Sequence, residues 1–412
     1  MIFESIHAAG NYIPTRIDKP TSTTHKELKG LRVTAGTGFF QTMTQHLTMT
    51  RRGFYDRKIA ELLAFASSWT YSDISTYAYA MANHGLKNNN CVSITFTNDA
   101  LFVDTSAFIL QSQFRDTAII SFRGTKIRGP INWLTDATAR RESFLSAGEV
   151  HGGFHRAIRA IWPVLRPLLI AVAERRSVCE ELEYQKRIWL KSCGDTTPHE
   201  FPSGEPTGTA EEPSAAAEGS PAPAINDPII PNEPPILILP EKKPPAIYIT
   251  GHSLGGALAV LAGAILHRDD DFSTQFGPTV RGIYTYGQPM VGDSTFAREH
   301  KDSIGTILFR HIYERDIVPR LPPITMGRFE HIGREYHSTE TGWALRDKPA
   351  RRAITAGVSN IIGIAAWLTQ DVLPVSWLRL PFSWGHHSPI NYMRASMIAD
   401  PGAEFDPFAP TV

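Results

Sequence analysis

The spacing of apolar residues along the chain becomes regular only beyond residue 52. Residues 1–52 are polar, with scattered threonine and glycine and no clear period, so we predict an irregular N-terminal extension. Apolar residues then recur at the three- and four-residue spacing of a helix face, which predicts helices over 59–66, 72–83 and 155–176. Pro163 and Pro167 are expected to kink the last of these helices or to mark its start.

Short apolar runs between polar residues predict a second kind of element, the buried strand. Residues 91–96 and 101–103 are expected to pair as a hairpin that turns at Asn98-Asp99. Further strands are predicted over 117–122, 246–250, 281–286 and 306–313, with helices over 254–267 and 294–300. Because strands alternate with helices in this half of the chain, we predict an α/β fold with a mainly parallel central sheet and helices on both faces.

Residues 198–245 interrupt this pattern with a different composition. They hold 13 of the 30 prolines of the chain, and glutamate, alanine, glycine and serine fill most of the rest. So little apolar surface does not offset the entropy of ordering, which predicts a disordered insertion. The alternative is a proline-rich ligand for a partner domain. The main domain is therefore predicted over 53–397, with a C-terminal tail over 398–412.

Charge and cysteine content narrow the functional class. Lysine plus arginine and aspartate plus glutamate number 41 each among 412 residues, so no net field favours nucleic acid or an anionic membrane. Three cysteines without ligand-like spacing argue against a disulfide framework and a structural zinc site. The first residues lack the basic and apolar regions of a signal peptide. We expect a cytoplasmic or peripheral membrane location, although export without a leader would leave the same pattern.

A candidate nucleophile lies in Gly251-His252-Ser253-Leu254-Gly255. The Gly-x-Ser-x-Gly pattern alone is weak, but here it lies between a predicted strand and an apolar helix, as a nucleophile elbow requires. The strained turn leaves no room for side chains at 251 and 255, and it exposes the hydroxyl of Ser253. The N–H of Leu254 then lies at a helix N-terminus, where it can stabilise an oxyanion. The alternative is a glycine-rich turn with an incidental serine.

A serine hydroxyl needs a base, and the base needs an orienting acid. In this architecture the order is serine, acid, histidine. The candidate acids are Asp293, Asp302, Asp316 and Asp371. Asp316 fits best because it follows a predicted strand at its carboxyl end, whereas Asp293 is expected to cap a helix. His386 and His387 precede Ser388-Pro389, a suitable helix start, and the residues alone do not decide between them.

Around these candidate residues, from about residue 117 to 392, the chain resembles the fungal-type class 3 lipases of the α/β-hydrolase fold. The resemblance rests on four segments in order and two supporting ones: Ser121-Phe-Arg-Gly-Thr125, Val150-His-Gly-Gly-Phe154, Ile249-Thr-Gly-His-Ser-Leu-Gly-Gly256 and Asp316-Ile-Val-Pro-Arg-Leu-Pro-Pro323, with Tyr286-Gly-Gln-Pro-Met-Val-Gly-Asp293 and His331-Ile-Gly-Arg-Glu335. Together these segments are more specific than the elbow alone.

The resemblance implies roles for further residues. Thr125 would supply the second oxyanion N–H, and residues 126–136 would form a lid with Trp133 and Leu134 as its apolar contacts. The family's histidine is commonly followed five residues later by tyrosine, which favours His387 because of Tyr392. The chain departs from the family in its insertion and in its long approach to the histidine over 340–385, and we expect neither the leader nor the disulfides of secreted members.

The sequence thus predicts a serine hydrolase that cleaves lipid carboxylic esters, acylglycerol or phospholipid, and needs no metal or cofactor. A lipase-like interaction module without turnover is the alternative, and a peptidase with the same triad is a further one. Residues 353–384 contain three tryptophans and follow Arg351-Arg352. They are interpreted either as a helix packed on the sheet or as a cap that docks on a lipid surface. The sequence identifies no protein partner.

Overall fold

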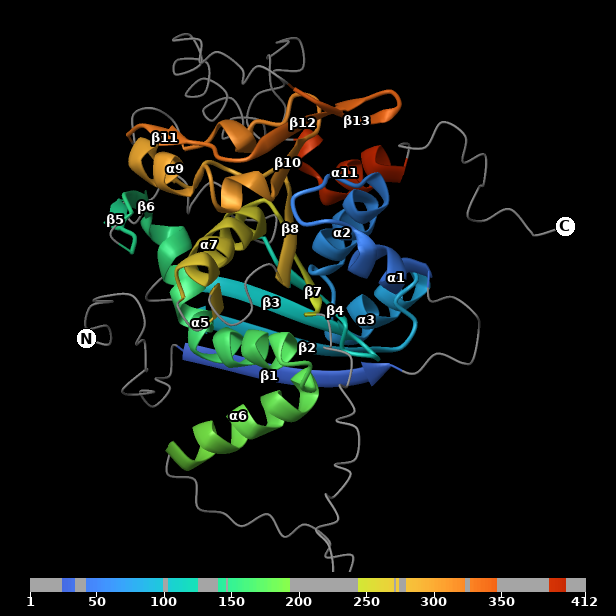
Figure 1. Ribbon diagram of the computed structural model, residues 1–412. Coiled ribbons are helices and arrows are strands. Elements are labelled where there is room, and N and C mark those ends of the chain that lie inside the picture. Colours follow the sequence, from blue (N-terminus) through green and yellow to red (C-terminus); the bar gives the residue numbers. More distant parts are fainter. Residues whose placement is uncertain are drawn as a thin grey trace, which may run out of the picture.

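The computed structural model describes residues 24–33, 42–98, 103–124, 140–145, 147–192, 244–269, 272–273, 279–322, 327–346 and 385–397. Their central feature is a nine-stranded sheet of order β1-β2-β3-β4-β7-β8-β10-β12-β13 (Figure 1). The strands are β1 (Thr24–Val33), β2 (Asn89–Asn98), β3 (Val103–Ser112), β4 (Thr117–Phe122), β7 (Ala246–His252), β8 (Val280–Tyr286), β10 (Leu308–Ile312), β12 (Arg334–Thr339) and β13 (Gly342–Leu345).

The sheet is mixed, with parallel strands at its centre. Strands β4, β7, β8, β10 and β12 run parallel to their neighbours within this group. Antiparallel strands β1, β2 and β3 extend the sheet at one edge, and β13 extends it at the other. The predicted α/β fold is confirmed, and its parallel part is the segment that positions the candidate site. A small second sheet pairs β5 (Arg141–Ser143), β6 (Glu149–His151), β9 (Gly292–Asp293) and β11 (Phe329–Glu330).

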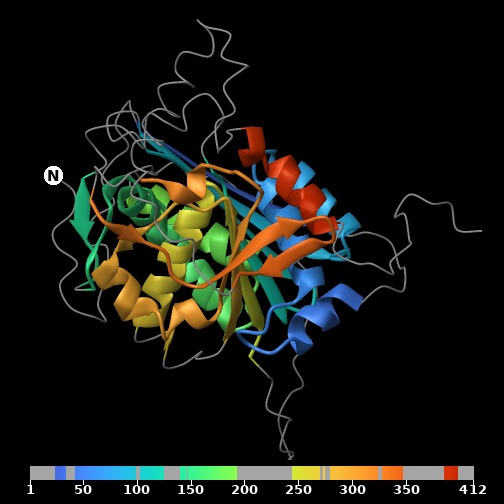
Figure 2. The same cartoon turned by 90° about the horizontal axis from the view of Figure 1, so that it is seen from above.

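Helices cover both faces of the large sheet, as predicted (Figures 1 and 2). One face packs against α5 (Gly152–Ala173), α6 (Val178–Ser192), α7 (Leu254–Arg268) and α9 (Ser294–His300). The other packs against α1 (Thr42–Met49), α2 (Arg57–Trp69), α3 (Ile74–Asn83) and α11 (Pro389–Met397). Neighbouring strand residues alternate between the two cores: Ile247 and Ile249 face the first, and Tyr248 faces the second.

Most predicted elements agree with the structure to within a few residues. The hairpin pairs Asn98 with Val103, but its second strand continues to Ser112, well beyond the predicted end. Helix α5 begins at Gly152 and passes through both Pro163 and Pro167, so neither proline marks its start. Short 3₁₀ turns include η4 (Ile304–Thr306), which precedes β10, and η5 (Val318–Arg320) and η7 (Gly385–His387), which lie near the site.

The predicted irregular extension over 1–52 is wrong for two stretches, which form β1 and α1. Strand β1 lies at the sheet edge and pairs with β2 along all ten of its residues. An edge strand can carry charged residues because part of it faces solvent, so its apolar pattern is weak. The apolar residues of β1 that contact the two cores are Leu28, Leu31 and Val33. In α1, Leu47 is fully buried, but polar threonines obscure the helical period.

Several predictions fall outside the described residues and stay predictions. They concern residues 1–23, the lid over 126–136, nearly all of the insertion over 198–245, the segment over 353–384 and the tail over 398–412. Among the described helices, none has the length and apolar character needed to cross a membrane.

Candidate active site

Ser253 occupies a strained turn between β7 and α7. Its φ of 59° and ψ of −129° are unusual for a residue with a side chain. The turn is held by the Ser253 N–H, which donates to the Tyr286 carbonyl at 2.9 Å. A Cβ atom on Gly251 would overlap the backbone of Gly255, and one on Gly255 would overlap the carbonyl of Phe122. Both glycines are therefore required by close backbone approach, as the motif predicts.

Three side chains from distant parts of the chain form one line of hydrogen bonds. His387 Nε2 lies 2.7 Å from Ser253 Oγ, and His387 Nδ1 lies 2.7 Å from Asp316 Oδ2. Asp316 lies in the loop after β10, and His387 ends η7 just before α11. Ser253 and Asp316 are 3% and 1% exposed, so these hydrogen bonds lie in a low-dielectric environment that strengthens them.

The Asp316 carboxylate is hydrogen-bonded through both of its oxygens. The N–H of Val318 donates to Oδ1 at 2.9 Å, and the Tyr392 hydroxyl donates to Oδ2 at 2.5 Å. Burial and the neighbouring Asp316 raise the pKa of Tyr392 well above its usual value, so the phenol stays protonated. The Tyr392 oxygen in turn accepts the N–H of Tyr313 at 3.2 Å. The carboxylate is thus fixed in the orientation in which it meets His387.

The neighbouring His386 points to a different part of the loop after β10 that carries Asp316, called the acid loop below. Its Nδ1 accepts the N–H of Arg315 at 3.2 Å and lies 3.6 Å from Glu314 Oε2. Of the two histidines that the residues alone left open, the structure brings only His387 to Ser253. Among the other candidate acids, Asp293 caps α9 by accepting the Phe296 N–H, as expected. Asp302 is exposed in the turn that follows α9, and Asp371 lies outside the described residues.

One of the two proposed oxyanion donors can be described. Leu254 is the first residue of α7, where a backbone N–H has no acceptor within the helix. Thr125, Trp133 and Leu134 lie outside the described residues. The residue before Thr125 is Gly124, and a Cβ atom there would lie 3.1 Å from the Cβ of Ser253. The chain that leads to Thr125 therefore passes directly against the nucleophile.

Three residues at the site were not anticipated from the sequence. The Tyr71 hydroxyl lies 3.0 Å from His252 Nδ1, and His252 Nε2 lies 2.8 Å from the His387 carbonyl oxygen. Gly287 has a φ of +59°, and a Cβ atom there would lie 2.9 Å from both Asp316 Oδ2 and His387 Nδ1. Gly287 belongs to Tyr286–Asp293, one of the segments on which the family resemblance rests, so the resemblance could have identified it as a site residue. Tyr71 follows a helix far from the motifs, and no sequence pattern marks it.

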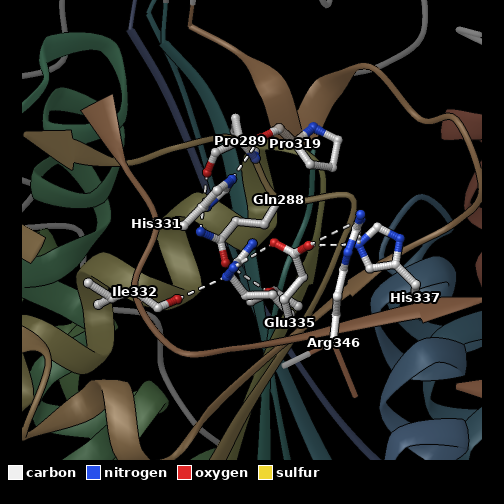
Figure 3. Close-up of polar contacts among 10 residues, drawn as sticks. Gln288, Pro289, Pro319, His331, Ile332, Glu335, His337 and Arg346 are labelled. Carbon is white, nitrogen blue, oxygen red and sulfur yellow. Dashed lines mark hydrogen bonds and ion pairs between the residues drawn. The ribbon is translucent and has the colours of Figure 1, made fainter. Parts of the chain in front are cut away.

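A second polar cluster supports the loop that carries Asp316 (Figure 3). His331 Nε2 lies 2.6 Å from the carbonyl oxygen of Pro319, which belongs to η5 directly after Asp316. Arg310 of β10 donates to the Ile332 carbonyl at 2.9 Å and to Glu335 of β12 at 3.0 Å. These contacts join β10, β12 and the acid loop into one unit.

The carboxylate at the centre of this cluster is strongly stabilised in its charged form. Burial raises the pKa of Glu335, but the hydrogen bond from the His337 ring at 2.7 Å and the Arg310 guanidinium outweigh burial and lower it to about 2. Arg346 lies 4.0 Å away and adds positive charge. Among the residues that the structure describes, no group of three or more His, Cys, Asp or Glu side chains has the arrangement of a metal site.

A serine on a strand-to-helix turn, with a histidine and an aspartate in line at the carboxyl edge of parallel strands, defines the α/β-hydrolase fold. Residues 236–326, which include Ser253 and Asp316, match the family model described as Lipase (class 3).

Two curated relatives illustrate the range of the similarity. Triacylglycerol lipase OBL1 of Ricinus communis is 27% identical over 334 residues, which cover 78% of this chain and 58% of the relative. A lipase of Rhizomucor miehei is 44% identical over 95 residues, which cover 23% and 24% of the two chains. The chain thus spans little more than half the length of the first relative and about a quarter of the second.

Solved structures give a weaker similarity. Lipase II from Rhizopus niveus has a TM-score of 0.42 at 19% identity, over 80% of this chain and 92% of that one. The Rhizomucor miehei lipase propeptide complex has a TM-score of 0.41 at 23% identity, over 71% and 72%. TM-scores below 0.5 do not decide a fold, and the fold assignment rests on the strand order and the elbow.

Proposed function

We propose that this chain is a serine hydrolase that cleaves carboxylic esters of lipids. The observation that carries the proposal is the hydrogen-bonded line from Ser253 through His387 to Asp316, at 2.7 Å for each step. The match of residues 236–326 to the class 3 lipase family model supports lipid esters over peptides as substrates. The relatives named lipase and triacylglycerol lipase point the same way, and acylglycerols and phospholipids are both candidate substrates.

The geometry is suited to acyl transfer to water. His387 Nε2 takes the proton of Ser253 as Oγ attacks the ester carbonyl. The N–H of Leu254 and, by the family resemblance, that of Thr125 stabilise the tetrahedral oxyanion. Asp316 accepts a hydrogen bond from the Nδ1–H of His387 and stabilises the imidazolium that forms. His387 then protonates the leaving alcohol, and water hydrolyses the acyl-enzyme by the same steps in reverse order.

Replacing the nucleophile tests the proposal. Ser253→Ala is expected to lower the turnover of p-nitrophenyl butyrate about a millionfold, since other serine triads lose that much. A fluorophosphonate should label wild-type Ser253 and leave the variant unlabelled. Ser67→Ala is a matched control, because Ser67 is also buried but bonds only the Ala64 carbonyl within α2. A folded wild-type protein that neither hydrolyses the ester nor reacts with the probe would instead support a catalytically silent interaction module.

We further propose that residues 353–384 bring the protein to a lipid surface as a peripheral protein. The support is from sequence: this segment contains Trp367, Trp377 and Trp384, and Arg351-Arg352 precede it. In the sequence, the segment directly precedes η7, which carries His387.

The double variant Trp377→Ala with Trp384→Ala should separate this proposal from the core-helix alternative. Weaker binding to phosphatidylcholine vesicles and slower hydrolysis of emulsified triacylglycerol are expected, because interfacial tryptophans contribute to membrane binding. Turnover of p-nitrophenyl butyrate should stay within about twofold of wild type, because Ser253, His387 and Asp316 are unchanged. Equal losses on both substrates, or an unfolded protein, would favour a helix packed on the sheet.

A further inference from the structure

A chain of hydrogen bonds runs behind the nucleophile and reaches the base by a second route. Tyr71, between α2 and α3, places its hydroxyl 3.0 Å from His252 Nδ1. His252 Nε2 lies 2.8 Å from the backbone carbonyl oxygen of His387. His252 directly precedes Ser253 and is 2% exposed. The side chain of His252, the residue next to the nucleophile, therefore contacts the backbone of the base, His387.

The direction of each hydrogen bond follows from the groups involved. A carbonyl oxygen cannot donate, so His252 Nε2 must carry a proton and donate it to His387. Burial, and then the nearby His387, lower the pKa of His252 well below its usual value, so the ring is neutral and Nδ1 has a free lone pair. The Tyr71 hydroxyl is then the donor to Nδ1. Burial raises the pKa of Tyr71 well above its usual value, which keeps this hydroxyl protonated.

The same hydroxyl lies against the chain that leads to Thr125. A Cβ atom on Gly124 would overlap the Tyr71 hydroxyl and lie 2.7 Å from the His252 carbonyl oxygen. Tyr71 and His252 are thus in close contact with the segment before Thr125, with the elbow and with the histidine turn. The imidazole rings of His252 and His387 lie 4.6 Å apart between centroids, tilted by 32°. A shift of His252 would therefore move His387 relative to Ser253.

We propose that His252 and Tyr71 are positioning residues that set the separation of Ser253 and His387. His252 holds the His387 carbonyl, and Tyr71 fixes the tautomer and orientation of His252. The inference deepens the proposed hydrolase function and rests on it. Displacing a catalytic group by about 1 Å can cost a factor of about 100 in rate, so loss of this anchor should affect turnover more than substrate binding.

Three variants test the two residues separately. Tyr71→Phe removes one oxygen atom, His252→Leu removes both hydrogen bonds at similar bulk, and His252→Gln keeps an amide N–H directed at His387. The matched control is Tyr248→Phe, because Tyr248 is a buried tyrosine whose hydroxyl donates to the Leu47 carbonyl at 2.9 Å, away from the triad. Each protein is assayed for kcat and KM on p-nitrophenyl butyrate, for the rate of Ser253 phosphonylation by a fluorophosphonate, and for thermal midpoint.

Tyr71→Phe and His252→Leu should lower kcat and the phosphonylation rate by about 10- to 100-fold, with KM within about twofold of wild type. His252→Gln should recover part of the His252→Leu loss. Tyr248→Phe should lower the thermal midpoint without lowering kcat. If His252→Leu fails to fold, the kcat of Tyr71→Phe alone tests the positioning role, because this variant removes only one oxygen atom.

The positioning role is overturned if Tyr71→Phe and His252→Leu keep kcat within about twofold of wild type, since catalytic misplacement costs far more. It is also overturned if Tyr248→Phe loses as much kcat as these two variants at a similar decrease in thermal midpoint, because the losses in kcat would then follow stability alone. A wild-type protein that reacts with the fluorophosphonate but hydrolyses no ester would overturn the proposed function instead. In that case the phosphonylation rates of the variants still decide the positioning role, because phosphonylation also requires His387 as base.

Discussion

At the scale of single residues, the two adjacent histidines offer a sharp comparison. His387 contacts both Ser253 and Asp316, whereas His386 contacts Arg315 and Glu314. His387→Ala should lower kcat by several orders of magnitude because the base is lost. His386→Ala should lower kcat about tenfold or less, since it only loosens the acid loop. Steady-state assays of the two purified variants measure the difference, and the reverse order would reassign the base.

Tyr392 gives a second test at this scale. Tyr392→Phe removes the hydroxyl that donates to Asp316 and that accepts the Tyr313 N–H. A hydrogen bond to a charged group contributes about 2 kcal/mol, so the free energy of unfolding should fall by roughly that amount. We expect kcat to fall about tenfold, equivalent to about 1.4 kcal/mol in the barrier, because Asp316 orients the base less well. Urea unfolding and esterase assays measure both quantities.

Tyr77→Phe is the control for Tyr392→Phe, because Tyr77 is a buried tyrosine whose hydroxyl bonds Ser121. It should lose stability while kcat changes less than about twofold, since Tyr77 has no contact with the triad. A Tyr392→Phe protein that keeps full kcat would show that Asp316 needs no help from this hydroxyl.

Local chemistry explains which of these residues the sequence could predict. Ser253 lies in a motif whose glycines are forced by backbone overlap, and Asp316 follows a recognisable strand. Adjacent histidines have nearly the same sequence context, so only the spacing to Tyr392 favoured His387. Tyr71 acts through a contact 181 positions away in the chain, and such a contact depends on the packing of whole elements.

At the scale of elements, Glu335 of β12 and Arg310 of β10 form a buried ion pair next to the acid loop. Glu335→Gln would leave the fully buried Arg310 guanidinium without its charged partner. Breaking a buried pair in this way costs about 3 kcal/mol or more, so the urea midpoint should fall clearly. The exposed pair of Glu183 with Lys186 is the control, and Glu183→Gln should cost less than about 1 kcal/mol. Similar losses in the two variants would contradict this role for the pair.

The same scale explains where the fold was hard to predict. The central strands β4 and β7 are buried along their whole length, so they appear as continuous apolar runs. Strands β12 and β13 lie towards the far edge, and Tyr336 is the one buried residue of β12, among exposed and half-buried ones. Edge strands need fewer apolar residues, so their pattern is diluted by polar ones. Both edges of the sheet were missed for this shared physical reason.

At the scale of the whole molecule, the parallel strands act as a platform for chemistry from distant segments. Ser253 follows β7, Asp316 follows β10, and Gly287 follows β8 between them. Carboxyl ends of parallel strands meet at one edge, so loops that are far apart in sequence converge there. Helix α11 packs against α2 on the second face, which brings His387 to the same edge. The site therefore depends on the integrity of the complete sheet and on both helical layers.

Buried histidines make this whole assembly sensitive to acid. Burial lowers the pKa of His311 to about 3 and that of His151 to about 4, and it lowers that of His252 well below the usual value. In the unfolded chain each should titrate near about 6.5. Below that pH the unfolded state binds more protons than the folded state. Stability contributed by the neutral rings is therefore complete above about pH 6.5 and decreases as the pH falls.

Each such histidine contributes a slope of up to about 1.4 kcal/mol per pH unit, so three give up to about 4 kcal/mol per unit well below pH 6.5. Urea unfolding at pH 8, 7, 6 and 5 should give a nearly constant free energy at the two higher values and a steep decrease below them. The His311→Gln variant has no titrating group at this position. Its free energy of unfolding should therefore fall less steeply with pH than that of wild type, by up to about 1.4 kcal/mol per pH unit. A free energy of unfolding that stays level or rises from pH 7 to pH 5, or an unchanged slope in His311→Gln, would mean that these rings take up protons within the folded protein.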